Sequence, residues 1–278
     1  MAHEDVLEAH RRIAGEIDRT PVTICDALSE RVGAQLFFKC ENLQRTGAFK
    51  LRGAMNAVLG LDRSVTAVAT HSSGNHGAAL SYAAATRGLR AYIVVPEVAV
   101  RKKRAAIAKF GGEVIDCGPN LNDRETKLKE VMASTGAVFI PPYDDERIVA
   151  GQGTAALELM QEVADLDQIW VPVGGGGLAS GTVWAAAESH VEVIGAEPEL
   201  AKDAYLSLQA GRIVDAFPPA TIADGLLTSL GEVTFGILHG NATRIFLASE
   251  EGIVSARALL RLNKLDVEPS SAVPLAAM

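Results

Sequence analysis

Apolar residues along this chain fall into short runs that alternate with longer, alanine-rich segments of mixed polarity. Short apolar runs rich in Val, Ile and aromatic residues predict buried strands, whereas the longer segments have the length of helices. Four runs of this kind occupy residues 65–70, 91–96, 168–173 and 191–199. Strands that alternate with helices predict an α/β fold with parallel-rich sheets covered by helices.

Two stretches of the chain repeat one plan of strand, glycine-rich turn and helix. In the first, "VTAVAT" leads into "HSSGNHG" and a helical segment; in the second, "QIWVPV" leads into "GGGG" and then "LASGTVWAAAES". Each turn opens a helix, where unpaired backbone N–H groups and the helix dipole favour an anion. The pattern therefore predicts two anion-binding helix starts.

The region between the two stretches predicts an inserted domain. Its sequence, "RKKRAAIAKFGGEVIDCG" followed by "NDRETKLKEVMASTGAVFI", has the pattern of helix, strand, helix and strand. We predict a small domain of residues 61–145 inserted into a large domain of residues 1–60 plus 146–278.

Charge and composition narrow the classes of function. The chain has 26 Lys and Arg against 34 Asp and Glu, a formal net charge of -8, so it offers no basic field to a nucleic acid or an anionic membrane. Its three cysteines lack the paired spacing of zinc or redox sites, and the first 22 residues have the pattern of neither a signal peptide nor a membrane span. We expect a reduced, cytoplasmic protein with no nucleic-acid or membrane partner.

The glycine run "GGGGLASG", residues 174–181, is the first candidate site. Glycines allow a backbone to approach a phosphate closely and to aim its N–H groups at it. A flexible turn is one alternative, although four consecutive glycines carry a large entropic cost. A dinucleotide is another, because Gly174, Gly176 and Ala179 fit G-x-G-x-x-[GA] and Glu197 lies where a ribose-binding acid would follow.

Two further features carry chemistry. The turn "SSGNHG", residues 72–77, gathers two hydroxyls, an amide and an imidazole, whereas a simple capped turn, the alternative, needs only one such side chain. We expect it to bind a ligand with several acceptors, such as a carboxylate. Lys50, in "TGAFKLRG", is either a surface lysine lying along the protein or a partly buried amine that forms a Schiff base with an aldehyde.

An amine nucleophile, a phosphate cradle and a second anion site together indicate a pyridoxal-phosphate enzyme. The motifs that support this appear in the order "TGAFKLRGAMNAV", "THSSGNHGAALSYAA", "IVAGQGTAALEL", "VPVGGGGLASG", "GAEP", "TIADGL" and "EPSSAVPLAAM". In order and spacing the chain resembles, over nearly its whole length, the fold-type II pyridoxal-phosphate enzymes. This family includes serine racemase, the serine/threonine dehydratases and the 3-hydroxyaspartate dehydratases.

The resemblance implies a two-domain fold like that of tryptophan synthase β, with a cofactor-binding large domain and a substrate-side small domain. It implies that Lys50 holds pyridoxal 5'-phosphate and acts as base at the substrate α-carbon. The residues implied to bind the cofactor are Phe49, Lys50, Asn75, Gly174, Gly175, Gly176, Gly177 and Leu178. Those implied to bind the substrate are Ser72, Ser73, Asn75, His76 and Arg124.

The resemblance also implies the reaction. Loss of a β-hydroxyl from serine, threonine or 3-hydroxyaspartate would give a 2-oxo acid and ammonia. Ser73 matches the serine that reprotonates the opposite face in serine racemases, so an amino-acid racemase is the close alternative. An NAD-dependent oxidoreductase and a catalytically impaired pyridoxal-phosphate-binding protein are the distant ones, and the family's habit implies a homodimer.

Two charged motifs have family counterparts. Glu197, the Ala201 carbonyl and Asp203 match a Mg²⁺ or Ca²⁺ site of the racemase-like branch, and hard oxygen ligands suit these cations; a solvated acidic turn is the alternative. Arg124 matches an arginine near the substrate mouth that would favour a second carboxylate; a surface helix arginine is the alternative.

The chain departs from the family pattern in two places. Ala48 stands where the family usually has serine. The resemblance also implies a further strand ending in S-G-G-N, whose serine bonds the cofactor's pyridine nitrogen, and the sequence reaches Met278 without that motif. We expect a truncated chain, another group facing that nitrogen, or reduced activity.

Overall fold

The computed structural model describes residues 2–72, 74–97, 101–215 and 220–278, and the chain divides into two compact units. Unit 1 comprises Met1–Leu7, Thr20–Cys40 and Tyr143–Met278, and unit 2 comprises Glu8–Arg19 and Glu41–Pro142. The boundary predicted after residue 60 therefore lies at residue 41 in this division. The physical reason is that the helix carrying Lys50 packs against the helix that follows "SSGNHG".

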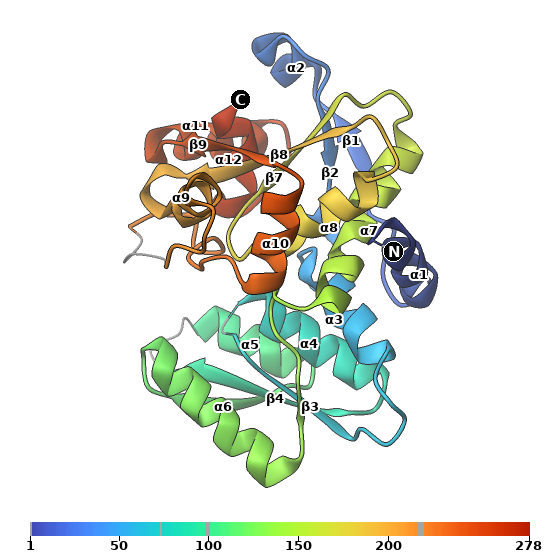
Figure 1. Cartoon of the computed structure of the whole chain (residues 1–278), viewed down its shortest axis with the longest axis vertical. Helices are drawn as coiled ribbons and strands as arrows, with labels where there is room; N and C mark the ends of the chain where they lie inside the picture. Colours follow the sequence, from blue (N-terminus) through green and yellow to red (C-terminus); the bar gives the residue numbers. More distant parts are fainter. Residues whose placement is uncertain (1, 73, 98–100, 216–219) are drawn as a thin grey trace. The chain divides into compact units, whose positions relative to one another are not determined.

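Unit 1 is built on a parallel sheet of order β7-β8-β9, with a separate antiparallel pair, β1 and β2 (Figure 1). Helix α1 (Ala2–Ile13) contributes residues to both units. The other elements of unit 1 are β1 (Val22–Ile24), α2 (Asp26–Val32), β2 (Phe37–Lys39), α7 (Glu146–Glu162), β7 (Gln168–Pro172), α8 (Gly177–Ala186), β8 (Glu192–Pro198), η2 (Glu199–Ala201), α9 (Asp203–Ala210), α10 (Glu232–Gly240), β9 (Arg244–Ala248), α11 (Glu250–Leu262) and α12 (Pro269–Ala277).

Unit 2 is built on a parallel sheet of order β5-β4-β3-β6. Its elements are η1 (Glu41–Leu43), α3 (Lys50–Leu59), β3 (Ala67–His71), α4 (Asn75–Thr86), β4 (Arg90–Pro96), α5 (Arg101–Lys109), β5 (Glu113–Cys117), α6 (Leu121–Thr135) and β6 (Val138–Phe139). The four strands predicted from apolar runs are confirmed as β3, β4, β7 and β8, and so is the α/β fold.

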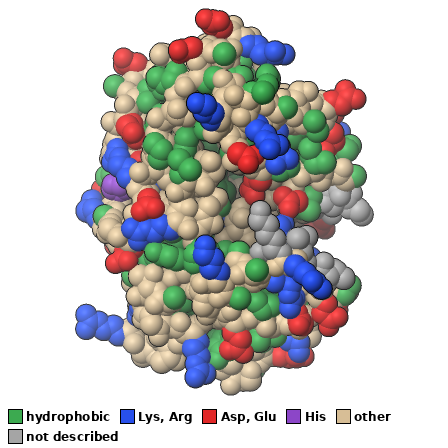
Figure 2. Space-filling view, turned by 180° about the vertical axis from the view of Figure 1, so that it is seen from behind, with side chains coloured by type: hydrophobic (Ala, Val, Ile, Leu, Met, Phe, Trp, Pro, Cys, Tyr) green, Lys and Arg blue, Asp and Glu red, His purple; other side chains and the backbone are tan. Residues whose placement is uncertain are grey.

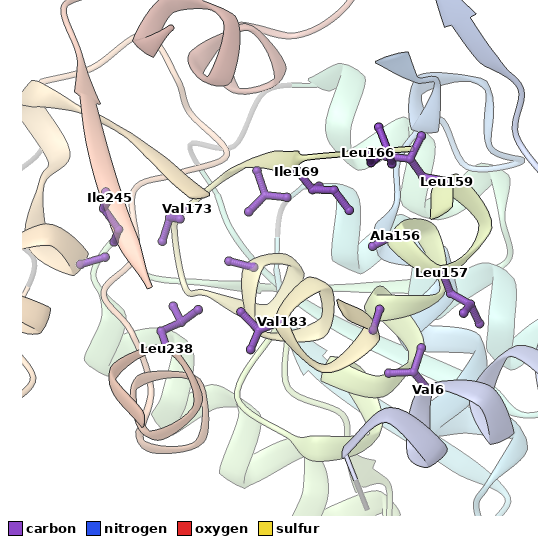
Figure 3. Close-up of a cluster of buried hydrophobic side chains, with 14 of the residues drawn as sticks. Val6, Ala156, Leu157, Leu159, Leu166, Ile169, Val173, Val183, Leu238 and Ile245 are labelled. Carbon is purple, nitrogen blue, oxygen red and sulfur yellow. The ribbon is translucent and has the colours of Figure 1, made fainter. Parts of the chain in front are cut away.

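The core of unit 1 lies between its sheet and the helix pair α7 and α8. Figure 3 shows Ile169 of β7 and Val183 of α8 among the apolar side chains of this cluster. The two helices approach so closely that a Cβ on Gly153 would lie 2.5 Å from the Gly181 carbonyl oxygen. Glycine is therefore required where α7 and α8 cross. The crossing holds α8 against α7 near the start of α8, directly after the glycine run.

The sheet of unit 2 has two distinct faces. Ala67 and Ala69 of β3 pack with Leu128 and Val131 of α6 in one apolar cluster. The alternate residues point the other way, toward α4, where a Cβ on Gly77 would lie 3.0 Å from Ile93. Both faces are thus covered, which explains the continuous apolar runs in the sequence.

The surface carries both signs of charge. On the face drawn in Figure 2, the coloured Lys, Arg, Asp and Glu side chains are interspersed with one another, and the described residues there form no broad basic area. Within the described ranges, no helix combines the length and apolarity needed to span a bilayer.

Candidate active site

Lys50 is the first residue of α3 and belongs to unit 2. Its side chain is half-buried, and its Nζ donates a 2.8 Å hydrogen bond to the Pro142 carbonyl oxygen. The same amine lies 5.2 Å from the centre of the Phe49 ring, within range of a cation–π interaction. The amine is therefore bound into the protein, which disfavours the interpretation of Lys50 as an ordinary surface lysine.

The predicted carboxylate-binding turn forms the start of α4. The Ser72 hydroxyl accepts a 3.3 Å hydrogen bond from the Gly74 N–H, and Asn75 is the first residue of the helix. A Cβ on Gly77 would lie 2.5 Å from the Ser72 carbonyl oxygen, so glycine is required for the tight turn. Ser73, the proposed second acid/base group, lies outside the described residues.

His76 is buried, and its imidazole is hydrogen-bonded within the protein. Its side chain is 3% exposed, and Nε2 lies 3.1 Å from the Ile140 carbonyl oxygen. Burial lowers its pKa to about 3, assisted by the positive charge of Lys50, although the Ile140 hydrogen bond acts in the opposite direction. The ring is therefore neutral, with its proton on Nε2, because a carbonyl can only accept.

This tautomer leaves Nδ1 of His76 as a buried acceptor with no partner among the described residues. A neutral acceptor does not bind a carboxylate, so Nδ1 is not suited to the substrate contact that the resemblance implies for His76. Any such contact from His76 has to come from its backbone N–H, at the start of α4.

Arg124 lies in the first turns of α6, half-buried. Its Nε donates a 3.4 Å hydrogen bond to the Asn120 carbonyl oxygen. Its charge also acts on His71, whose pKa is lowered by burial and by Arg124. Arg124 is therefore close enough for its charge to act on His71, and its substrate role stays a prediction.

The glycine run lies in unit 1, between the end of β7 and the start of α8. Gly176 has φ +82, a left-handed conformation that glycine adopts without strain. A Cβ on Gly175 would lie 2.4 Å from the Tyr143 ring, and one on Gly174 would lie 3.0 Å from Leu226 Cα. The run is thus closely packed, which disfavours the flexible-turn interpretation.

The predicted metal ligands are buried. Glu197 is 1% exposed and Asp203 is 2% exposed, so the interpretation as a solvated acidic turn is wrong. The Glu197 carboxylate accepts 2.9 Å hydrogen bonds from the N–H groups of Ala204 and Tyr205, which leaves it unsuited to a ribose. Ala201, whose carbonyl completes the predicted set, is also buried.

Both acids have raised pKa values. Burial raises the pKa of Glu197 to about 8, against the hydrogen bonds from Tyr205 and Ala204, and raises that of Asp203 to about 6. Asp203 Oδ2 has no hydrogen-bond partner within the described ranges. Those ranges contain no group of three or more His, Cys, Asp or Glu side chains able to hold a metal, so a cation here would need backbone carbonyl or water ligands as well.

The residues present fit a phosphorylated aldehyde cofactor. They provide a half-buried amine at Lys50. They also provide a run of glycines at the start of the ten-residue helix α8, where larger side chains would fill the space.

Three residues near these groups were not indicated by the sequence. It did not point to Pro142, because the contact with Lys50 is made by a backbone oxygen, which has no sequence signal. It also did not point to Tyr143 beside the cradle, or to His71 beside the Ser72 turn.

Comparisons with known proteins agree with this assignment. Residues 13–278 match the family model described as pyridoxal-phosphate dependent enzyme. The chain is 47% identical over 281 residues to β-hydroxyaspartate dehydratase of Paracoccus denitrificans, covering 99% of this chain and 89% of the relative. It is 46% identical over 282 residues to serine racemase of Dictyostelium discoideum, covering 99% and 87%.

Solved structures are similar over the same extent. The crystal structure of the Dictyostelium discoideum serine racemase has a TM-score of 0.94 at 46% identity and covers 99% of this chain and 90% of its own. The maize serine racemase has a TM-score of 0.96 at 40% identity, with 99% and 85% covered. These similarities overturn the alternative of an NAD-dependent oxidoreductase.

Proposed function

The chain belongs to the family of pyridoxal-phosphate dependent enzymes, and from this premise we propose that it is a dehydratase of a small β-hydroxy amino acid. The substrate is of the class of serine, threonine and 3-hydroxyaspartate, and the products are a 2-oxo acid and ammonia. The observation that carries the proposal is the placement of the Lys50 amine in unit 2, together with the start of α4, which we propose to hold the substrate carboxylate. The charge of Lys50 acts on His76, the second residue of α4.

Each residue has a defined task in this proposal. Bound pyridoxal phosphate supplies an electron sink that makes removal of the α-proton feasible near neutral pH. Lys50 would carry the cofactor and move the α-proton, the backbone N–H groups from Gly174 to Leu178 would bind its phosphate, and Phe49 would lie beside its ring. The Ser72 hydroxyl and the backbone at the start of α4 hold the substrate carboxylate, while Asn75 binds the cofactor's phenolic oxygen.

The first experiment locates the cofactor. The purified protein is loaded with pyridoxal phosphate, reduced with borohydride and digested, and the labelled peptide is identified by mass spectrometry. We expect the label on Lys50 and none in Lys50→Ala, whereas Lys129→Ala, an exposed lysine of α6, keeps it. Label on another lysine would contradict the assignment.

The second experiment measures the reaction. Release of 2-oxo acid and ammonia is followed for serine, threonine and 3-hydroxyaspartate in both enantiomeric series. Protein that takes up the cofactor at Lys50 but forms no 2-oxo acid from any of them would be the catalytically impaired alternative.

Racemisation is the second candidate function, favoured by the serine at position 73 and by the 46% identity to a serine racemase. On this proposal Ser73 returns a proton to the face of the α-carbon opposite Lys50. Chiral analysis of the remaining amino acid tests it, because Ser73→Ala is expected to lose racemisation and keep elimination. Loss of both activities together would contradict a role confined to racemisation.

A divalent cation, Mg²⁺ or Ca²⁺, belongs to the proposal as a stabilising ion on Glu197, Asp203 and the Ala201 carbonyl. The burial of Glu197 and Asp203, which have no cationic partner within the described ranges, supports this ion. A bound cation would offset the cost of burying two carboxylates. We expect CaCl2 or MgCl2 to raise the thermal midpoint of the protein and Asp203→Asn to abolish the rise.

The proposal also includes a homodimer and a cytoplasmic location. The family resemblance supports the dimer, which light scattering of the purified protein would test. Cys25, Cys40 and Cys117 are buried and form no disulfide among the described residues, which supports a reducing compartment.

A further inference from the structure

The imidazole of His76 is a buried group that the proposed reaction does not use. The side chain is 3% exposed, and its Nε2–H donates to the Ile140 carbonyl oxygen at 3.1 Å. His76 is the second residue of α4, whereas Ile140 directly follows β6. The hydrogen bond therefore ties the start of α4 to the segment that leaves the sheet after β6.

That segment, residues 140–142, is stiff but has few backbone donors. Ile140 is fully buried, and its N–H donates to the Ala69 carbonyl of β3 at 2.9 Å. Pro141 and Pro142 have no backbone N–H and cannot donate to β3 in turn. Ile140 and Pro141 each precede a proline, which restricts them to extended conformations. The position of Pro142 therefore follows from the position of Ile140.

The Pro142 carbonyl is the group that receives the Lys50 amine. Nζ of Lys50 donates to it at 2.8 Å, two residues beyond the carbonyl that accepts from His76. Lys50 opens α3, which lies beside α4 in unit 2 (Figure 1), and its charge acts on the His76 ring. Two side chains from neighbouring helices thus donate to carbonyls on one short, stiff segment.

We propose that His76 is a positioning residue that fixes the Lys50 amine through residues 140–142. This inference rests on the proposed function, because it concerns the amine that moves the α-proton in that reaction. The His76 N–H holds the Ile140 carbonyl, the stiff segment carries this position to Pro142, and the Pro142 carbonyl sets where the Lys50 nitrogen lies.

The Pro142 carbonyl also suits the task of the amine. When Lys50 acts as base, the α C–H bond of the substrate breaks, a new N–H bond forms on Nζ, and the bonding pair stays with the substrate. The carbonyl accepts one N–H of the neutral amine, which restricts the direction of the lone pair that takes the proton. It accepts a stronger hydrogen bond from the ammonium group that results, so it favours the transfer.

The buried imidazole suits its own task. Burial lowers the pKa of His76 to about 3, and the charges of Lys50 and His71 act in the same direction, against the Ile140 hydrogen bond. The ring therefore stays neutral and adds no positive charge beside the ammonium group. It still donates one N–H from a rigid side chain.

Two amide substitutions test the proposal in the loaded enzyme. The longer side chain of His76→Gln places its N–H near the position of Nε2 and keeps the bond to Ile140, whereas the shorter one of His76→Asn does not reach that carbonyl. We expect His76→Asn to lower kcat about 10- to 100-fold, because a misplacement of about 1 Å can cost about 100-fold. KM should change less than about 2-fold, and His76→Gln should keep kcat within about 3-fold of the wild type.

A second measurement needs no turnover and no cofactor. The whole chain, before it is loaded, is acetylated with trace acetic anhydride, and the labelled lysines are quantified by mass spectrometry. Lys50 should react more slowly than the exposed Lys129 in the wild type and His76→Gln, and about 10-fold faster in His76→Asn, as for loss of a hydrogen bond to a charged group. Lys39, whose side chain is 8% exposed in unit 1, reports unfolding and should stay unlabelled in all three proteins.

The outcomes separate this inference from the proposed function. A raised KM with unchanged kcat in His76→Asn would place the imidazole against the substrate and overturn the positioning role. Equal kcat in the two variants, or equal labelling of Lys50 in the wild type and His76→Asn, would overturn it as well. Absence of 2-oxo acid from every substrate in the wild type would overturn the proposed function, and the labelling would still decide whether His76 controls the Lys50 amine.

Discussion

Acidification should destabilise the protein through His76, and the size of the effect follows from its burial. The folded ring has a pKa of about 3, against an ordinary value of 6.5. Between these values the unfolded ring takes up a proton and the folded ring does not, so the unfolded state binds more protons. The stability that His76 contributes is therefore present above pH 6.5 and is lost progressively as the pH falls toward 3.

The loss of unfolding free energy that His76 causes can be measured. At about 1.4 kcal/mol per pH unit, His76 alone lowers the free energy of unfolding by about 2 kcal/mol between pH 7 and pH 5. Urea unfolding followed by far-UV circular dichroism at these two pH values measures the change. In His76→Gln, which keeps an amide N–H for the Ile140 carbonyl and does not titrate, the pH-dependent loss should be smaller by that amount.

Two results would refute this reasoning. One is an equal loss of stability between pH 7 and pH 5 in the wild type and His76→Gln. The other is an NMR titration in which the His76 ring of the folded protein becomes protonated above pH 5. Either would mean that the buried Nε2–H hydrogen bond to Ile140 does not hold the ring neutral.

Four further substitutions test local packing and capping contacts by chemical denaturation. Gly175→Ala places a Cβ 2.4 Å from an aromatic ring and should cost about 2 kcal/mol, whereas Gly236→Ala, where no atom lies within 4 Å, should stabilise its helix by up to about 1 kcal/mol. Arg52→Lys loses the bidentate contact of a fully buried guanidinium with Glu41 and should cost about 2 kcal/mol. Asp144→Ala removes the carboxylate that accepts from the first N–H groups of α10 and should cost about 1 kcal/mol. An unchanged free energy of unfolding in Gly175→Ala, Arg52→Lys or Asp144→Ala would contradict the corresponding contact.

The local features of this protein could be predicted from the sequence because they depend on residues near one another in the chain. Apolar runs of six to nine residues became β3, β4, β7 and β8 within two residues of the predicted bounds. The glycine-rich turns do open helices, and the strained or crowded positions, such as Gly176 and Gly77, are glycines. Turn conformation and strand period are local properties, so residue order alone determined them.

The roles of individual polar groups needed the tertiary structure. Glu197 was compatible with a ribose, a cation or solvent until α9 was seen to donate two backbone hydrogen bonds to it. His76 was expected to help hold the substrate carboxylate, and only the structure showed that the Ile140 carbonyl, 64 residues away, takes the N–H of its ring. Sequence also placed Lys50 outside the inserted domain, whereas the packing of α3 on α4 puts it within unit 2.

The sequence by itself thus determined the strands and helices and the two glycine-rich turns that precede α4 and α8, through composition and short-range periodicity. Only the tertiary structure decided which side chains share a face and which are removed from water. Strand order and helix packing bring distant residues together, and burial then sets their charge state. His71 shows this most clearly, because β3 and β6 have to pair before its ring stacks on that of Phe139.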